Sequence, residues 1–194
     1  MKNFVFGILS VLATTFVFGQ EIPKGLAIHQ RAPNFTAVDQ NGKKFVLSDA
    51  LKKGPVVLVF YRGEWCPYCN KQLKKLEDSL VFIQQKSATL IAVTPEKPEN
   101  ITKTIGKTKA SYPILFDDGL TIMKAYGVAF KIDSSSVLKY KNYGIDFAVQ
   151  NGSNGANLPI PAVYIINKQG VIVYRHFDAD YKKRASVNEI LSNL

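Results

Sequence analysis

The sequence is poor in the residues that build metal sites and disulfide frameworks, since its 194 residues include only two cysteines and two histidines. The cysteines, Cys66 and Cys69, are three residues apart, so a bridge between them would close almost no loop and add little stability. The histidines, His29 and His176, have no metal-ligand spacing to the cysteines or to each other, which argues against a zinc site. We therefore expect no metal and no cofactor, and we interpret the cysteines as a reactive dithiol.

The sequence also lacks an arginine-rich stripe, a stacked aromatic pattern and an internal repeat, although its net charge is +10. The lysines are scattered in pairs, and the one longer basic run is the triplet Lys182-Lys183-Arg184. Scattered charge is typical of a solvated basic surface, whereas a nucleic-acid-binding protein gathers its charge on one face. We predict no nucleic-acid partner.

Residues 1–19 have the pattern of a secretory signal peptide. Lys2 supplies the positive charge, residues 4–18 are predominantly apolar, and cleavage is predicted before Gln20. The apolar stretch is short for a membrane span, which favours cleavage over the alternative of an uncleaved anchor. No cysteine follows this stretch, which excludes a lipid-modified N-terminal cysteine. We expect a mature domain of residues 20–194 that is exported, either periplasmic or secreted, with no stable membrane insertion after cleavage.

The two cysteines lie in residues 61–71, YRGEWCPYCNK, between a predicted strand and a predicted helix. Residues 56–61 are apolar at consecutive positions, which is typical of a strand buried on both faces. From about residue 67 to 84, apolar residues recur at three- and four-residue steps, which predicts an amphipathic helix. The N–H groups and dipole at the start of a helix stabilise a thiolate. We predict that Cys66 lies at the exposed helix edge and that Cys69, one turn further on, can form a disulfide with it.

The order of the predicted elements indicates an α/β class and a thioredoxin-like fold, with a central mixed sheet flanked by helices. Two short strands near residues 36 and 46 form an N-terminal β extension. Residues 134–158 form an insertion before the last hairpin, and the composition of residues 151–157 predicts a flexible loop there. The other predicted elements are strands at 56–61, 89–93, 112–116, 163–166 and 171–175, and helices at 67–84, 98–110, 120–126 and 186–194.

Three segments of the chain carry a resemblance to a known family. They are Gln30-Arg31-Ala32-Pro33-Asn34-Phe35, Val59-Phe60-Tyr61-Arg62-Gly63 followed by Trp65-Cys66-Pro67-Tyr68-Cys69, and Leu158-Pro159-Ile160-Pro161 with the hairpin after it. They resemble the peroxiredoxin-like branch of the thioredoxin superfamily (the AhpC/TSA type, or redoxins), in its subgroup with a W-C-P-Y-C motif. The resemblance covers about residues 26–194.

The resemblance implies roles for individual residues. Cys66 would be the attacking, or peroxidatic, cysteine, and Cys69 would be the resolving cysteine. Pro161 matches the cis proline of thioredoxin-like proteins, which abuts the dithiol and orients an extended substrate. The residues alone leave cis and trans open, since cis is the minority state of an X–Pro bond. We also interpret Trp65 as a residue that shields the dithiol and contacts substrate.

The sequence departs from typical peroxiredoxins at two positions beside the motif. Those proteins have a proline seven residues before the attacking cysteine and a Thr or Ser three before it, where this chain has Val59 and Gly63. The missing hydroxyl is the group that holds the peroxide oxygen. The arginine that typical members carry in the loop before the later strand is also missing. Arg62 or Arg175 is the expected substitute, and Arg62 is predicted to contact substrate.

The resemblance predicts a thiol-dependent peroxidase, an antioxidant enzyme that reduces hydrogen peroxide or alkyl hydroperoxides and is recycled by a thioredoxin-like reductant. The alternative is an exported thiol–disulfide oxidoreductase that acts on protein disulfides. Both reactions use the same dithiol, so the sequence leaves this choice open, together with the oligomeric state. Glu64, inside the motif, is interpreted as a solvated loop charge.

Overall fold

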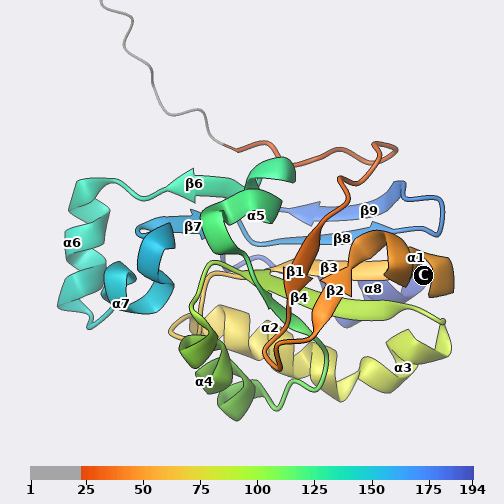
Figure 1. Ribbon diagram of the computed structural model, residues 1–194, viewed down its shortest axis with the longest axis horizontal. Helices are drawn as coiled ribbons and strands as arrows, with labels where there is room; N and C mark the ends of the chain where they lie inside the picture. Colours follow the sequence, from red (N-terminus) through yellow and green to blue (C-terminus); the bar gives the residue numbers. More distant parts are fainter. Residues whose placement is uncertain (1–22) are drawn as a thin grey trace, which may run out of the picture.

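The computed structural model describes residues 23–194, so the predicted signal peptide lies outside the described residues. A five-stranded mixed sheet with strand order β5-β4-β3-β8-β9 forms the centre of the molecule (Figure 1). β3, β4 and β5 run parallel to one another, and β8 pairs antiparallel with both β3 and β9. The strands are β3 (Val56–Phe60), β4 (Thr89–Thr94), β5 (Ile114–Phe116), β8 (Ala162–Ile166) and β9 (Ile172–Phe177). The predicted fold class and mixed sheet are confirmed.

The central strand β3 divides the core in two because its successive side chains point to opposite faces. Val57 and Val59 point to the same face as the two cysteines, and we call this the dithiol face. Leu58 and Phe60 point to the other face, which we call the tyrosine face because Tyr126 and Tyr164 lie in it. All five residues of β3 are fully buried, which explains its unbroken apolar sequence.

Different helices cover the two faces. The dithiol face is covered by α2 (Pro67–Asp78), α3 (Leu80–Gln85), α4 (Pro98–Thr108) and α8 (Val187–Ser192). The tyrosine face is covered by α1 (Leu47–Lys53) and α5 (Thr121–Ala125), which follows the short helix η1 (Asp118–Leu120). The N-terminal β extension is a separate two-stranded sheet of β1 (Thr36–Val38) and β2 (Lys44–Val46).

The helix predicted over residues 67–84 is divided at Ser79. The Ser79 N–H bonds to the Leu76 carbonyl, three residues back, and Ser79 has ψ near 6°, so the α-helical ladder stops there. The new helix turns Ile83 into the core and leaves Val81 and Phe82 half exposed. The prediction of one continuous helix was therefore wrong.

The insertion at residues 134–158 is ordered, and it forms one end of the molecule (Figure 1). It contains α6 (Ser134–Asn142), α7 (Phe147–Asn151), η2 (Gly152–Asn154) and β7 (Asn157–Pro159), and β7 pairs antiparallel with β6 (Ala129–Lys131). The predicted flexible loop was wrong. Asn154 is 3% exposed, and its Nδ2 donates to the carbonyls of Pro95 (2.9 Å) and Asp117 (3.0 Å). These side-chain hydrogen bonds fix a segment whose composition is typical of a loop.

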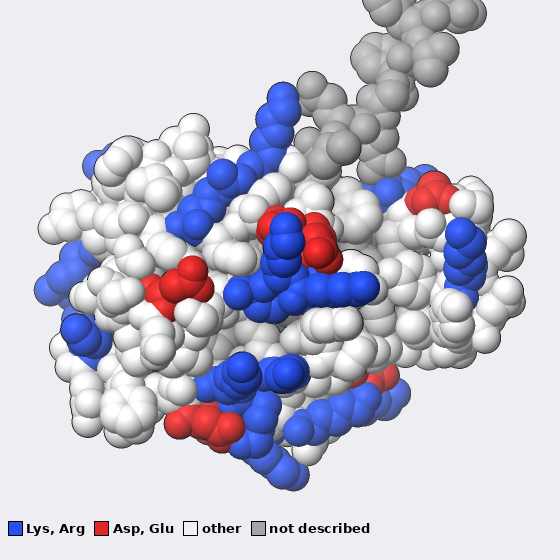
Figure 2. Space-filling view, turned by 180° about the vertical axis from the view of Figure 1, so that it is seen from behind, with Lys and Arg blue, Asp and Glu red and all other residues white. Residues whose placement is uncertain are grey.

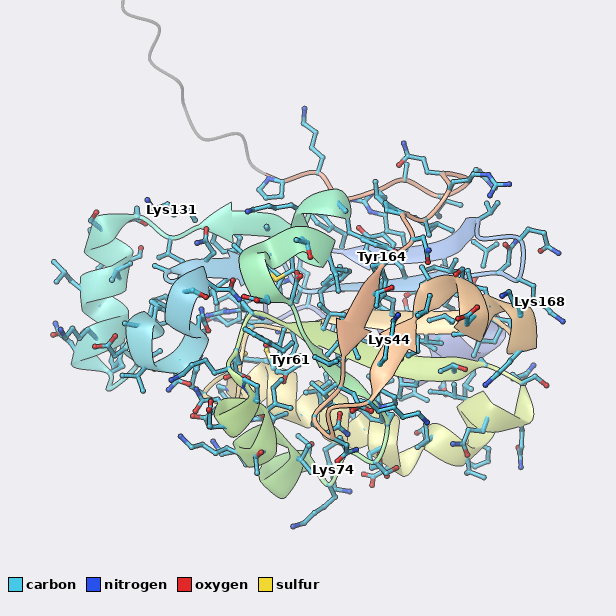
Figure 3. The ribbon with its side chains drawn as sticks, viewed as in Figure 1. Lys44, Tyr61, Lys74, Lys131, Tyr164 and Lys168 are labelled. Atoms are coloured by element: carbon cyan, nitrogen blue, oxygen red, sulfur yellow. The ribbon has the colours of Figure 1, made fainter. Side chains whose placement is uncertain are left out.

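The basic surface is divided into separate groups. On the face in Figure 2, patches of Lys and Arg are separated by uncharged surface and by Asp and Glu. In Figure 3, Lys74, Lys131 and Lys168 lie at the periphery, whereas Tyr61 and Tyr164 lie inside. None of the helices in residues 23–194 is long and apolar enough to cross a membrane.

Candidate active site

Cys66 is the N-cap residue of α2, and Pro67 is its first helical residue, as the sequence predicted. The Cys66 Sγ accepts a hydrogen bond from the Cys69 N–H at 3.4 Å, which satisfies one of the unpaired donors at the helix start. The predicted exposure was wrong, because Cys66 is 1% exposed and Cys69 is fully buried. Neighbouring aromatic side chains from the insertion and from the C-terminal loop cover this end of the helix.

The two thiols are both free and buried, and each affects the pKa of the other. The hydrogen bond with Cys69 and burial raise the pKa of Cys66. Burial also raises the pKa of Cys69, but the hydrogen bond from Cys66 and the charges of Arg184 and Arg62 outweigh it and lower that pKa to about 6. The pair therefore loses its first proton near neutral pH and keeps its second. Cys69 is the cysteine of the pair whose pKa is lowered, because the Arg184 guanidinium lies against its sulfur.

Arg62 lies beside the dithiol and is 5% exposed. Its guanidinium carbon lies 4.2 Å from the ring centre of Tyr181 and 4.8 Å from that of Trp65. Its Nη2 donates to the Tyr140 hydroxyl, while its buried Nε has no hydrogen-bond partner in the described chain. Arg62 thus places a cation and a free donor next to the cysteines.

Arg184 was missed by the sequence reasoning, which counted it as part of a basic surface triplet. Its Nη2 lies 3.4 Å from the Cys69 Sγ, and its Nη1 donates to Gln72 Oε1 at 3.1 Å. Arg184 and Cys69 are separated by 115 residues, so no local pattern connects them. Arg175, the other predicted source of charge, lies elsewhere. It donates to the Lys24 carbonyl and stacks on Phe177, beside the tyrosine face.

A buried acid, Glu96, lies on the dithiol face and was also missed. Burial raises the pKa of its carboxyl to about 8, and the charges of Glu64 and Cys69 add to this effect. Its Oε1 accepts from the Glu64 N–H at 2.6 Å. Glu64 itself is 9% exposed and pairs with Lys107, so its interpretation as a solvated charge was wrong.

Glu96 and Trp65 together explain why position 63 is glycine. A Cβ on Gly63 would lie 2.5 Å from Trp65 Nε1 and 2.7 Å from Glu96 Oε1, and the φ of Gly63 is +156°. Both the available space and the backbone conformation therefore exclude a side chain there. The Thr or Ser that typical peroxiredoxins have at this place does not fit this site.

Two adjoining cavities lie near the dithiol, and one of them reaches Cys66. That cavity, of about 420 Å³, is lined by Cys66 and Trp65, and the other, of about 430 Å³, is lined by Pro161 and by residues of β6 and β7. Both cavities are lined by Arg62, Ser136, Tyr140 and Tyr181. The structure thus brings the three predicted substrate-binding residues to one region.

The resemblance implied a cis bond before Pro161, but that bond is trans, and the described residues contain no cis peptide bond. Trans is the ordinary state of an X–Pro bond. Residues 23–194 also contain no group of three acidic, histidine or cysteine side chains placed to hold a metal ion.

The AhpC/TSA family model matches residues 28–175 of the chain. The thiol-disulfide oxidoreductase ResA of Halalkalibacterium halodurans is 25% identical over 179 residues, which cover 91% of this chain and 84% of the relative. A chloroplastic peroxiredoxin Q of Populus jackii is 32% identical over 99 residues, 51% of this chain and 46% of the relative. The crystal structure of peroxidoxin BcpB from Mycobacterium tuberculosis aligns with a TM-score of 0.65 at 19% identity, covering 89% of this chain and 96% of that one.

The fold and the paired cysteines at the start of α2 define a thiol-based oxidoreductase of the thioredoxin superfamily. Within that superfamily, the chain belongs to the AhpC/TSA family.

Proposed function

We propose that the protein is an exported thiol–disulfide oxidoreductase that acts on disulfide bonds of protein substrates through Cys66 and Cys69. The observation that carries this proposal is Gly63, where Trp65 and Glu96 leave no room for the hydroxyl that would hold a peroxide oxygen. The relative ResA bears the name of a thiol-disulfide oxidoreductase. Export is inferred from the signal-peptide pattern of residues 1–19.

The shape of the site also suits a polypeptide substrate. The cavity at Cys66 and the adjoining cavity at Pro161 share lining residues, and together they offer a largely apolar groove between the insertion and Pro161. The unpartnered Nε–H of Arg62, a residue that lines both cavities, is a buried donor in this region. Buried donors without partners are rare in folded proteins, and a backbone carbonyl of a bound peptide would satisfy this one.

The reaction uses the shared proton of the pair. As the Cys66 sulfur attacks a substrate disulfide, its proton passes to Cys69, and the first substrate sulfur leaves as a thiolate. Cys69 then loses the proton to that leaving thiolate and attacks the Cys66 sulfur. The substrate leaves with one thiol and one thiolate, which takes a proton from water, and the protein keeps a Cys66–Cys69 disulfide. A thioredoxin-like reductant returns the two electrons.

A second candidate function is the thiol-dependent peroxidase predicted first, with the same dithiol and reductant. The observation in its favour is the pair of arginines beside the cysteines, since Arg62 and Arg184 would stabilise the negative charge that develops on a peroxide oxygen. Peroxiredoxin Q of Populus jackii carries the name of such an enzyme. In this reaction Cys66 becomes a sulfenic acid, water leaves, and Cys69 forms the disulfide.

Substitution of each cysteine by serine separates the two reactions. We expect Cys66→Ser to abolish reduction of insulin disulfides, because it removes the attacking sulfur. Cys69→Ser will accumulate a mixed disulfide with an insulin chain, which mass spectrometry detects. Its reaction with hydrogen peroxide, followed by trapping of sulfenic acid, will be as slow as that of a free thiol. Fast sulfenic acid formation together with no insulin reduction would replace this proposal by the peroxidase.

A further inference from the structure

Arg184 lies on the loop between β9 and α8, beyond the residues 28–175 that the family model matches. All three side-chain nitrogens of Arg184 have hydrogen-bond partners. Nη2 contacts the Cys69 Sγ at 3.4 Å, Nη1 contacts Gln72 Oε1 at 3.1 Å, and Nε donates to the Tyr181 carbonyl at 2.7 Å. The guanidinium therefore joins α2 to the C-terminal loop at the sulfur of the inner cysteine.

The backbone on either side of Arg184 holds the guanidinium in this position. Ala185 is buried in the same core cluster as the two cysteines. Ser186 and Glu189 form a capping box at the start of α8, which fixes the direction in which the chain continues after Ala185. A donor held in place in this way needs little reorganisation when charge develops on the sulfur.

The proposed exchange reaction requires Cys69 to be a thiolate in the mixed disulfide, where the hydrogen bond present in the reduced pair is lost. In the mixed disulfide, Cys66 has no proton to donate, so Cys69 loses the hydrogen bond that stabilises its thiolate. The charges of Arg62 and Arg184 then favour the Cys69 thiolate. Glu96 opposes the thiolate when its carboxyl is ionised. Tyr61, the other titratable group beside Cys69, has a neutral hydroxyl because burial raises its pKa. Of the two cations, Arg184 is the one whose guanidinium touches the sulfur.

We propose that Arg184 is a catalytic residue that keeps Cys69 as the attacking thiolate during release of the substrate, and that it thereby sets the redox potential of the dithiol. This inference rests on the proposed function in that the dithiol must cycle between reduced and disulfide forms. In the disulfide, Cys69 carries no charge, and Arg184 retains Gln72 and the Tyr181 carbonyl. Arg184 therefore stabilises the reduced form selectively, which makes the disulfide a stronger oxidant.

The test compares Arg184→Gln, which removes the charge, with Arg184→Lys, which keeps it. Lys183→Gln is the matched control, since it removes the same charge one residue away, where the exposed Lys183 pairs with Asp178 at 3.4 Å. Three quantities are measured on the full mature chain: the thiolate absorbance against pH, the equilibrium with glutathione at pH 8, and the rate at which a preformed mixed disulfide releases its thiol.

We expect Arg184→Gln to raise the pKa of the thiol pair by about one unit or more. The glutathione equilibrium should shift close to tenfold toward the disulfide, which is about 30 mV. Release from the mixed disulfide should slow about tenfold at pH 6 to 7, in proportion to the lost thiolate. Arg184→Lys should recover most of each effect, and Lys183→Gln should behave as wild type.

Wild-type titration and potential in Arg184→Gln would overturn the proposal. Equal effects in Arg184→Gln and Arg184→Lys would also overturn it, because they would assign Arg184 a role in packing alone. If Lys183→Gln had as large an effect as Arg184→Gln, the thiol pair would be responding to the overall positive charge of this surface and not to the contact with Arg184, and the proposal would be overturned. The titration and the glutathione equilibrium involve no protein substrate, so failure of the proposed function would appear separately, as absence of insulin reduction.

Discussion

On the tyrosine face of the sheet, the Tyr126 hydroxyl donates to the Pro33 carbonyl at 3.0 Å, and the Tyr164 hydroxyl accepts from the Leu26 N–H at 3.1 Å. On the dithiol face, the hydroxyl of Tyr61 is just as deeply buried, but it makes no hydrogen bond of ordinary geometry with the neighbouring Thr94, Thr104 or Glu96. Arg62 Nε and Trp65 Nε1, which follow closely in sequence, are also without partners. Three of the unsatisfied groups in the described residues thus lie beside the cysteines.

The difference teaches where this fold gives up stability for chemistry. A buried polar group without a partner typically costs about 1 to 3 kcal/mol. The tyrosine face avoids this cost at Tyr126 and Tyr164, whose hydroxyls bond to the N-terminal segment before β1, although the Arg175 Nε beside this face has no partner. The dithiol face carries the cost, together with a buried acid at Glu96 and a glycine in a conformation that other residues rarely adopt. Strain of this kind is typical of functional sites.

Of the variants that compare the two faces, Gly63→Ala should lose the most unfolding free energy. The new Cβ meets Trp65 and Glu96 and forces a disfavoured φ, so we expect a loss of about 3 kcal/mol in unfolding free energy. Gly42→Ala is the control, because Gly42 also has positive φ (+73°) but has nothing within 4 Å of its Cβ position. It should cost about 1 kcal/mol. Urea unfolding measures both, and equal losses would mean that the dithiol face is not closely packed at this point.

Glu96→Gln tests whether the dithiol face makes stability depend on pH. Burial raises the pKa of Glu96 from 4.5 to about 8, so the folded state binds the extra proton and stability falls as the pH rises through this range. In the oxidised protein, where no thiolate contributes, the variant should be as stable as wild type near pH 4.5. At pH 9 it should be more stable by on the order of 2 kcal/mol.

This measurement needs the oxidised protein because, in the reduced protein, the thiols change stability with pH in the opposite direction to Glu96. The pKa of Cys69 is lowered to about 6, so in the reduced protein stability rises as the pH rises above that value. Glu99→Gln, at an exposed position of α4, controls for the loss of one negative charge. If the stability curves of oxidised Glu96→Gln and wild type run parallel from pH 5 to 9, Glu96 is not the group that responds.

Removal of tyrosine hydroxyls gives the smallest effect and compares the two faces most directly. Tyr164→Phe leaves the Leu26 N–H without its partner and should cost about 1 kcal/mol. Tyr61→Phe removes a hydroxyl that makes no hydrogen bond of ordinary geometry, so it should be neutral or slightly stabilising. Thermal unfolding of the two variants under identical conditions measures both changes in stability. A larger loss of stability for Tyr61→Phe than for Tyr164→Phe would contradict the difference between the two faces.

Local patterns in the sequence predicted the strand, the helix start and the position of both cysteines, because periodicity and the Pro67 signal act over a few residues. They did not predict the break at Ser79, since the apolar spacing continues across it. They misread residues 151–157, where Asn154 finds distant carbonyl partners. Glu96 and Arg184 reach the dithiol only through the folded chain, so no spacing rule could have found them.

Trp65 is the only tryptophan of the chain, and it directly precedes Cys66. Its ring also packs against Tyr140 of α6 and Phe147 of α7, with ring centres 5.3 and 6.0 Å away. All indole fluorescence of this protein therefore originates at one place, between the reacting sulfur and the insertion. Oxidation of the dithiol, entry of a peptide into the groove and loosening of α6 can each be followed by emission intensity, without any label.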